Sequence, residues 1–271
     1  MAGRIFFVLQ STLLLISYSF AQGNVRTDLK TYFDEYKVTG AFVMYDRNAG
    51  EWTIYNPEMT KRRLVPASTF DIANALIGLE TGAIPDENFV FKWNKEKRGL
   101  KVWERDLRLV EAFQNSCIPC FASLARMIEG DQFQFYLNKL QYGKASLAGD
   151  TNTFWLSGKV LISPEEQVRF LWNLYDEKLP LSTRSMKAVK AMMLRDDTPR
   201  YKLFGKTGWL TNDLENPIGK PSLGWFVGYQ ERAGNVYFFA TVIETEKTQA
   251  DFALARVDIS KRILKQLCVL E

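Results

Sequence analysis

The order of strand-like and helix-like segments is the feature that most constrains the fold. Near the N-terminus, β-rich runs from Gly40 to Tyr45 and from Trp52 to Tyr55 flank a turn-rich stretch, which predicts a hairpin. Three more strand-like runs lie near the C-terminus, at residues 203–208, 224–230 and 236–244, and the turn-like residues 232–235 between the last two predict a second hairpin. Because strands from both ends must bury a common apolar face, we expect them to meet in one antiparallel sheet.

The chain between the strand-rich ends is helical in pattern. From Ala67 to about Arg195, apolar residues recur at helical spacing and are interrupted repeatedly by glycine and proline. Amphipathic helices are also predicted at residues 28–37 and at about 250–267. The fold class is therefore α/β of the α+β type, with an antiparallel sheet flanked by helices plus a helical lobe. We expect one domain of two lobes over residues 22–271.

The first 21 residues have the layout of a cleavable secretory signal. Arg4 precedes an apolar stretch from Ile5 to Ile16, and small residues stand at Ser19 and Ala21. The apolar stretch contains polar residues and is short for a membrane span, although an uncleaved anchor is the alternative. We therefore expect signal cleavage, a periplasmic location, and no membrane association afterwards.

Histidine is absent from all 271 residues. This excludes Ser-His-Asp and Cys-His nucleophile systems as well as histidine-ligated zinc, so acid–base work falls to other side chains and no metal site is expected. The net charge of +4 comes without long lysine or arginine blocks. Nucleic acid is therefore not an expected partner.

Two cysteines have the C-x-x-C spacing of thiol–disulfide oxidoreductases, at Cys117 and Cys120. Such a motif should follow the first strand of a βαβ unit, whereas this one lies in the helical middle. A periplasmic oxidoreductase remains one alternative, and a buried structural pair is the other; the sequence leaves the oxidation state open. Cys268 is expected to fill the core.

Two short motifs could carry chemistry. Ser68 stands at the start of a predicted helix, near the positive end of its dipole, and Asp71 lies on the same face one turn later. Lys206, Thr207 and Gly208 end an apolar strand. Each motif alone is weak, because serine is also a common helix cap and Lys-Thr-Gly is common by chance.

The full set of motifs resembles the class D, or oxacillinase-type, serine β-lactamases. The similarity spans essentially the whole mature chain and rests on five motifs in order: Ser68-Thr69-Phe70, Ser116-Cys117-Ile118, Tyr142-Gly143-Lys144, Phe154-Trp155-Leu156 and Lys206-Thr207-Gly208-Trp209. The resemblance implies the fold shared by serine β-lactamases and penicillin-binding transpeptidases.

The resemblance also implies a role for each matching residue. Ser68 corresponds to the nucleophile that is acylated by a β-lactam, Ser116 to the serine that relays a proton to the leaving nitrogen, and Lys206 to the lysine that shapes the field around it. The substrate-binding positions correspond to Thr207, Gly208, Trp209 and Arg256, with backbone N–H groups of Ser68 and Trp209 as the oxyanion hole. Trp155 corresponds to the residue that steadies the general base, with Leu156 and Ile118 as its apolar cover.

Position 71 departs from the family pattern. Class D enzymes carry a lysine there, which binds carbon dioxide as a carbamate and serves as the general base for acylation and deacylation. Asp71 cannot form this carbamate, so no cofactor is expected. Its oxygens would fall about 4 to 5 Å short of the carbamate oxygens, and burial should raise its pKa. We expect slow acylation of Ser68 and an impaired deacylation.

The expected partners are small-molecule β-lactam antibiotics, and the sequence leaves a homodimer open. The alternative function is a β-lactam-binding protein or sensor module that acylates without turnover, although a sensor would need a further membrane segment. Glu165 and Glu166 follow Ser163 and Pro164 at a predicted helix start, where acidic residues usually complement the helix dipole. We therefore expect them to be structural.

Overall fold

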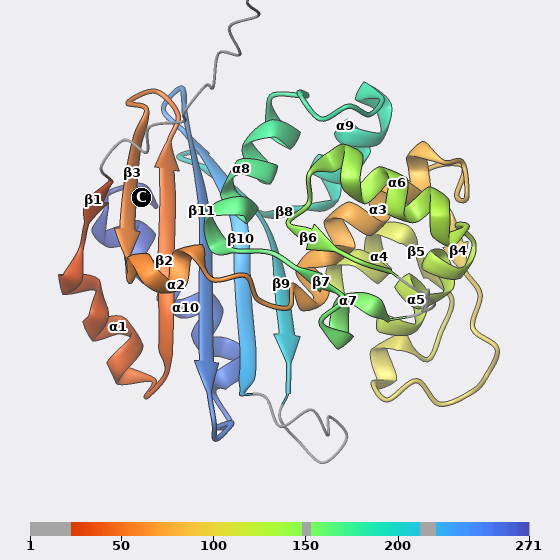
Figure 1. The fold of residues 1–271 in the computed structure, drawn as a ribbon, viewed down its shortest axis with the longest axis horizontal. Coiled ribbons are helices and arrows are strands. Elements are labelled where there is room, and N and C mark those ends of the chain that lie inside the picture. Colours follow the sequence, from red (N-terminus) through yellow and green to blue (C-terminus); the bar gives the residue numbers. More distant parts are fainter. Residues whose placement is uncertain (1–22, 148–152, 212–220, 271) are drawn as a thin grey trace, which may run out of the picture.

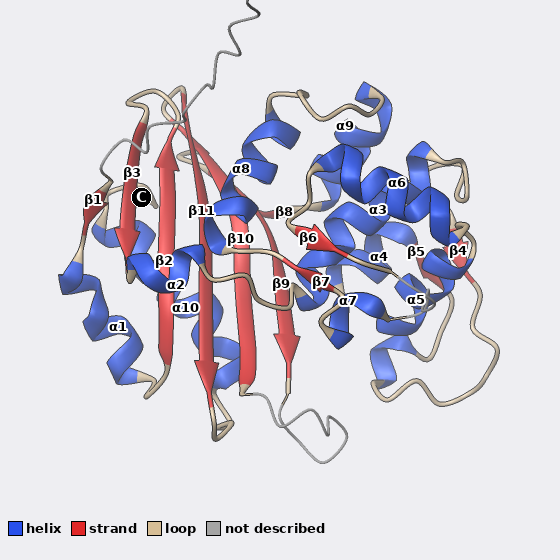
Figure 2. Ribbon diagram, viewed as in Figure 1, coloured by secondary structure: helices blue, strands red, loops and turns tan. Residues whose placement is uncertain are grey.

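The computed structural model describes residues 23–147, 153–211 and 221–270 (Figure 1). The predicted signal peptide, residues 1–21, lies outside the described residues. In the described part, a sheet lies beside a group of helices, and the two regions are distinct in Figure 2. No helix of this part is both long enough and apolar enough to cross a membrane.

The sheet has seven strands drawn from both ends of the described chain. β2 pairs with β11, with Val43 opposite Ala240, which confirms that N- and C-terminal strands meet. All neighbouring strands are antiparallel except β1 and β3. In spatial order the strands are β1 (Asn24–Val25), β3 (Glu51–Tyr55), β2 (Thr39–Asp46), β11 (Asn235–Thr245), β10 (Ser222–Arg232), β9 (Lys202–Leu210) and β8 (Leu194–Asp197).

Both predicted hairpins, β2–β3 and β10–β11, are confirmed. The two edge strands β1 and β8 were not predicted from the sequence. β1 has only two residues, and β8 is a charged segment of four residues that lacks apolar alternation. Such short edge segments become strands only because a neighbouring strand offers its backbone hydrogen-bonding groups.

The alternation of side chains along β2 divides the interior into two cores. Ala41, Val43 and Tyr45 face the larger core, whereas Phe42 and Met44 face a smaller one on the opposite side of the sheet. The smaller core is covered by helices α1 (Lys30–Glu35) and α10 (Phe252–Gln266). The other face is covered by α2 (Pro57–Lys61) and α8 (Pro164–Tyr175), so the sheet is buried on both faces.

The helical lobe is built from the middle of the chain, as predicted. Its helices are α3 (Asp71–Glu80), α4 (Leu109–Gln114), α5 (Ile118–Arg126), α6 (Gly130–Leu140), α7 (Phe154–Ser157) and α9 (Thr183–Met192). Two small two-stranded sheets complete it, β4 (Val90–Phe91) with β5 (Leu107–Arg108) and β6 (Lys144–Ala145) with β7 (Val160–Leu161). Short 3-10 turns cover Thr27–Leu29, Ala67–Phe70 and Lys101–Trp103.

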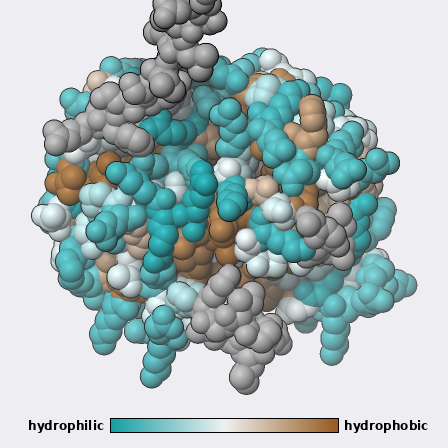
Figure 3. All heavy atoms as spheres, in the orientation of Figure 1, coloured by the Kyte–Doolittle hydropathy of each residue, from teal (hydrophilic) through white to brown (hydrophobic). Residues whose placement is uncertain are grey.

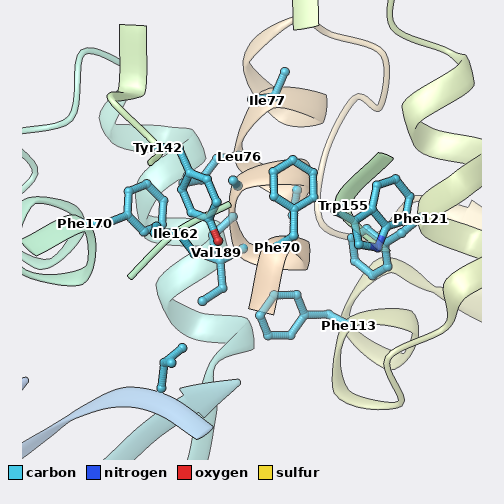
Figure 4. Packing of buried hydrophobic residues seen from close by; sticks show 14 of the residues in the cluster. Phe70, Leu76, Ile77, Phe113, Phe121, Tyr142, Trp155, Ile162, Phe170 and Val189 are labelled. Atoms are coloured by element: carbon cyan, nitrogen blue, oxygen red, sulfur yellow. The ribbon is translucent and has the colours of Figure 1, made fainter. Parts of the chain in front are cut away.

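Phe70 lies at the centre of an aromatic cluster in the larger core. Its ring stacks on Trp155 at 5.6 Å and meets Tyr142 and Phe154 edge-on, each at 5.4 Å. Figure 4 shows Phe70 between the rings of Tyr142 and Trp155. Because Phe70 follows Ser68 by two residues, this packing fixes the turn that carries the serine.

We expect Phe70→Ala to lower the free energy of unfolding by about 3–5 kcal/mol, because it removes a fully buried ring and leaves a cavity. Urea unfolding followed by tryptophan fluorescence measures the change. The matched control is Phe135→Ala, since that ring is 58% exposed and should contribute within about 1 kcal/mol. Equal losses for the two variants would contradict the role of the cluster.

The expectation for Cys268 is wrong. The residue lies just beyond α10 in a left-handed conformation, and its free thiol is exposed. The apolar periodicity of α10 ends before it, so the neighbouring Val269 enters the smaller core instead. A cysteine at a helix end has no periodic neighbours from which its burial could be predicted.

Candidate active site

Ser68 lies in the 3-10 turn Ala67–Phe70, directly before α3. The turn is anchored on both sides: Trp225 Nε1 donates to the carbonyl of Val65 at 2.9 Å, and Thr69 Oγ1 donates to the carbonyl of Pro66 at 2.7 Å. Ala67 has a φ of 48°, a conformation that is costly for a residue with a Cβ. Ser68 itself is buried, with 6% of its surface exposed, like the rest of the turn.

Strand β9 passes along this turn at very close range. A Cβ on Gly208 would lie 2.9 Å from the carbonyl oxygen of Pro66 and 3.2 Å from the backbone nitrogen of Thr69. Only glycine allows this approach without a shift of the backbone. The requirement explains the glycine after Lys206 and Thr207, and it brings β9 beside the serine turn.

Lys206 is fully buried and lies at the centre of the site. Its Nζ donates to Ser116 Oγ at 2.5 Å and to the carbonyl of Thr207 at 3.1 Å, and it lies over the Phe113 ring at 5.4 Å. Burial lowers the pKa of Lys206 to about 8, although the nearby Asp71 carboxylate opposes this shift. The amine is therefore still mostly protonated at pH 7.

Asp71 faces Lys206. Its Oδ2 lies 3.0 Å from Lys206 Nζ, so the two side chains form a buried ion pair. The side chain is 2% exposed, and burial raises the pKa of Asp71 to about 6 against the opposing effect of Lys206. Between pH 6 and 8 both groups are charged, so the carboxylate serves as the counterion of the lysine.

Ser116 occupies a strained turn between α4 and α5. Its φ is 48°, in the left-handed region that a residue other than glycine seldom adopts. The turn is held by backbone hydrogen bonds from Ser116 to Phe113, at 3.2 Å, and from Cys117 to Ala112, at 2.9 Å. This conformation places the Ser116 hydroxyl against the Lys206 amine.

Arg256 on α10 contributes a second cation near β9, and this residue is half-buried. Its guanidinium lies 5.6 Å from the centre of the Trp209 ring, and two of its nitrogens, Nε and Nη1, have no hydrogen-bond partner among the described residues. Burial, followed by the charge of Arg195, lowers the pKa of Arg256 to about 10. The charge of Arg256 also acts on Lys206, and its buried N–H groups, which lack a partner in the described part of the chain, suit an anionic group.

Trp155 is fully buried on α7, and its Nε1 has no hydrogen-bond partner among the described residues. The resemblance assigns this indole to the general base, yet the Asp71 carboxylate is engaged with Lys206 instead. Position 71 also has no amine that could form a carbamate. The residues present therefore do not fit the carbamate. Leu156 and Ile118 are both half-buried and pack against the larger core.

The other candidates have structural partners. Glu165 is buried and accepts a hydrogen bond from Thr60 Oγ1 at 3.0 Å, and Glu166 caps α8 together with Ser163 while it pairs with Arg63. Cys117 and Cys120 form a disulfide whose two residues are buried. Within the described ranges, no group of three potential ligands could hold a metal ion.

Sequence reasoning missed two neighbours of the lysine. Phe113 supplies the ring beneath its amine, and the charge of Arg195, on β8, contributes to lowering the pKa of Lys206. Phe113 carries only the signal of a core residue in a helix. Arg195 carries no signal, because its strand has no apolar alternation.

Figure 3 shows one face of the molecule, which is mostly hydrophilic but has apolar residues near its middle.

Comparison with known proteins agrees with this arrangement. A family model described as the penicillin binding protein transpeptidase domain matches residues 35–267. The chain is 41% identical to Beta-lactamase OXA-5 from Pseudomonas aeruginosa over 208 residues, or 77% of each protein. It is 33% identical to Regulatory protein BlaR1 from Bacillus licheniformis, over 86% of this chain and 38% of that protein.

Solved structures show the same relationship. The crystal structure of a class D β-lactamase from Sebaldella termitidis superimposes with a TM-score of 0.85 at 36% identity, over 92% of this chain and all of that one. Sequence identity, coverage and fold thus agree with the motif resemblance. The chain belongs to the penicillin-binding transpeptidase family and, within it, to the class D β-lactamases.

Proposed function

We propose that this protein reacts with β-lactam antibiotics through Ser68 and holds the resulting acyl-enzyme, because hydrolysis of the ester is slow. The observation that carries the proposal is the ion pair between Asp71 and Lys206. The contact between Lys206 and Ser116 still supports a slow acylation, but the Asp71 side chain is held by Lys206 and does not act as a general base.

Acylation is supported by the contact between Lys206 and Ser116. When Ser68 attacks the lactam carbonyl, the ring nitrogen needs a proton as its bond to carbon breaks. Ser116 transfers its proton to that nitrogen and takes up the proton that Ser68 releases, so the step needs no net proton. The ammonium of Lys206, 2.5 Å from the Ser116 oxygen, stabilises the negative charge that develops there during the transfer. Arg256 and Thr207 bind the carboxylate that β-lactam antibiotics carry.

Deacylation lacks a base in this arrangement. A water molecule must be deprotonated as it attacks the ester, by a group within about 2.6–3.2 Å of it. The Asp71 carboxylate is already paired with Lys206, so it is not placed to take a proton from that water. Its pKa, although raised to about 6, still leaves it mostly ionised at pH 7. Position, not protonation, is therefore the limiting factor at pH 7.

Intact-mass spectrometry of the protein mixed with benzylpenicillin tests the proposal. We expect a mass increase of one whole drug molecule per chain, which persists for minutes to hours after excess drug is removed. Rapid loss of the adduct together with many turnovers of drug would show that deacylation is intact. Absence of any adduct, with drug left unchanged, would exclude the reaction itself.

The pH dependence of acylation is a separate prediction. Lys206 stabilises charge on Ser116 only while it is protonated, so the acylation rate constant should fall as pH rises through about 8, the lowered pKa of Lys206. Well above that pH the fall approaches tenfold per pH unit. Stopped-flow measurement with nitrocefin between pH 6.5 and 10 gives the profile. A rate that rises through this range would instead identify neutral Lys206 as a general base.

The same blocked deacylation favours a second function, a β-lactam sensor or binding protein that acylates without turnover. The similarity to BlaR1 covers a part of that longer regulatory protein. Steady-state hydrolysis separates the two functions: a slow enzyme releases hydrolysed drug and regains free Ser68 within the assay, whereas a binding protein remains acylated. We further propose a periplasmic location, which cell fractionation would test.

A further inference from the structure

The disulfide between Cys117 and Cys120 adjoins the candidate active site directly. Cys117 follows Ser116 in sequence, and it is the residue that precedes the first turn of α5. Both half-cystines are essentially inaccessible, at 0% and 1% exposure. The bond therefore joins the residue after Ser116 to the end of the first helical turn, inside the protein.

The segment around Ser116 is held from a second side by the loop before β5. Trp103 Nε1 donates to the carbonyl of Asn115 at 2.9 Å. Arg98 Nη1 donates to the carbonyl of Trp103 at 3.3 Å and lies 4.0 Å from Cys120 Sγ. The residue before Ser116 and the disulfide after it are thus tied to the same loop.

Ser116 needs such support because its backbone is strained. A residue with a Cβ in the left-handed region is disfavoured relative to the ordinary helical and extended regions, and such strain persists only where the surroundings enforce it. If Ser116 relaxed, its hydroxyl would leave the 2.5 Å contact with Lys206. Small displacements of a reacting group are costly, since a shift of 1 Å can reduce a rate by about 10²-fold.

We propose that the Cys117–Cys120 disulfide is a positioning element of the active site: it holds Ser116 in its left-handed conformation, with the hydroxyl against Lys206. The expected effect on the acylation rate rests on the proposed function, in which Ser116 donates a proton during acylation of Ser68. Opening the bond requires a reductant. A phosphine does so by taking up the oxygen of one water molecule, while the two sulfurs receive its two hydrogens and become thiols.

The test compares oxidised and reduced protein in a Cys268→Ala background, which removes the exposed thiol and leaves the disulfide as the redox-active pair. Complete reduction by tris(2-carboxyethyl)phosphine is verified by thiol labelling after mild unfolding. We expect the acylation rate constant for nitrocefin to fall about tenfold on reduction, with little change in the dissociation constant of the non-covalent complex. Removal of the phosphine and reoxidation should restore the rate.

A double variant, Cys117→Ala with Cys120→Ala, should match the reduced protein and be insensitive to phosphine. The pH dependence of the acylation rate constant distinguishes this role from general destabilisation. In reduced protein the fall of the rate constant near pH 8 should become smaller, because the Ser116 hydroxyl no longer contacts the charged Lys206. Equal rates and equal pH profiles for oxidised and reduced protein would overturn the proposal.

Hydrogen exchange separates failure of this inference from failure of the proposed function. Amides of residues 115–121 should exchange at least tenfold faster after reduction, whereas amides of β10 should be unchanged. If neither form is acylated, the proposed function fails, and the exchange result alone decides whether the disulfide holds Ser116. Equal exchange in the two forms would then overturn the positioning role.

Discussion

Replacing Asp71 with lysine in buffer that contains bicarbonate is expected to raise the turnover of a penicillin by about 10²–10⁴-fold, the usual contribution of a general base. Lysine restores the amine that class D enzymes convert to a carbamate, and its longer side chain reaches beyond the Asp71 position. Nε1 of Trp155, for which the described residues offer no hydrogen-bond partner, is available to bind the new group. Hydrolysis followed at the absorbance of the lactam ring measures the gain.

Two controls separate the base from other effects of the substitution. The same variant in buffer depleted of carbon dioxide should lose most of the gain. Asp71→Asn removes the charge without supplying an amine, so it should turn over no faster than the parent protein. The interpretation would be wrong if Asp71→Asn reproduced the gain, or if the parent protein already hydrolysed penicillin as fast as the lysine variant.

Ser68→Ala is expected to abolish the covalent adduct and to reduce reaction with nitrocefin by about 10⁴-fold or more, because Ser68 supplies the oxygen of the acyl bond. Intact-mass spectrometry detects the loss directly. Since Ser68 lies in a turn anchored by Val65, Pro66 and Thr69, removal of its hydroxyl should leave the fold intact. The unfolding midpoint in urea checks this.

The matched control is Ser123→Ala on α5, which removes a hydroxyl from the helical lobe and should retain adduct formation. Ser116→Ala should give an intermediate result, with the adduct formed more slowly. The oxidoreductase alternative makes the opposite prediction, since its activity would survive Ser68→Ala and disappear in Cys117→Ala. Both Cys117 and Cys120 are buried, so a protein substrate has little access to their sulfurs.

Much of the fold could be predicted from local pattern. The β-rich apolar runs of β2, β10 and β11 and the helical period of α10 are properties of consecutive residues, so they can be read without knowledge of the tertiary structure. The placement of Ser68 before a helix, with Asp71 one turn later, follows from the same local geometry. The departure from lysine at position 71 is likewise visible in the sequence alone.

Which side chains contact one another in the site was decided only by the tertiary structure. Lys206 is 90 residues from Ser116 in sequence, and no local pattern indicates that β9 passes the turn between α4 and α5. The ion pair of Asp71 with Lys206, the oxidised state of Cys117 and the left-handed backbone of Ser116 have the same origin. Sequence determines which segments bury their apolar faces, whereas packing of the two cores determines which polar groups are brought together and shift each other's pKa.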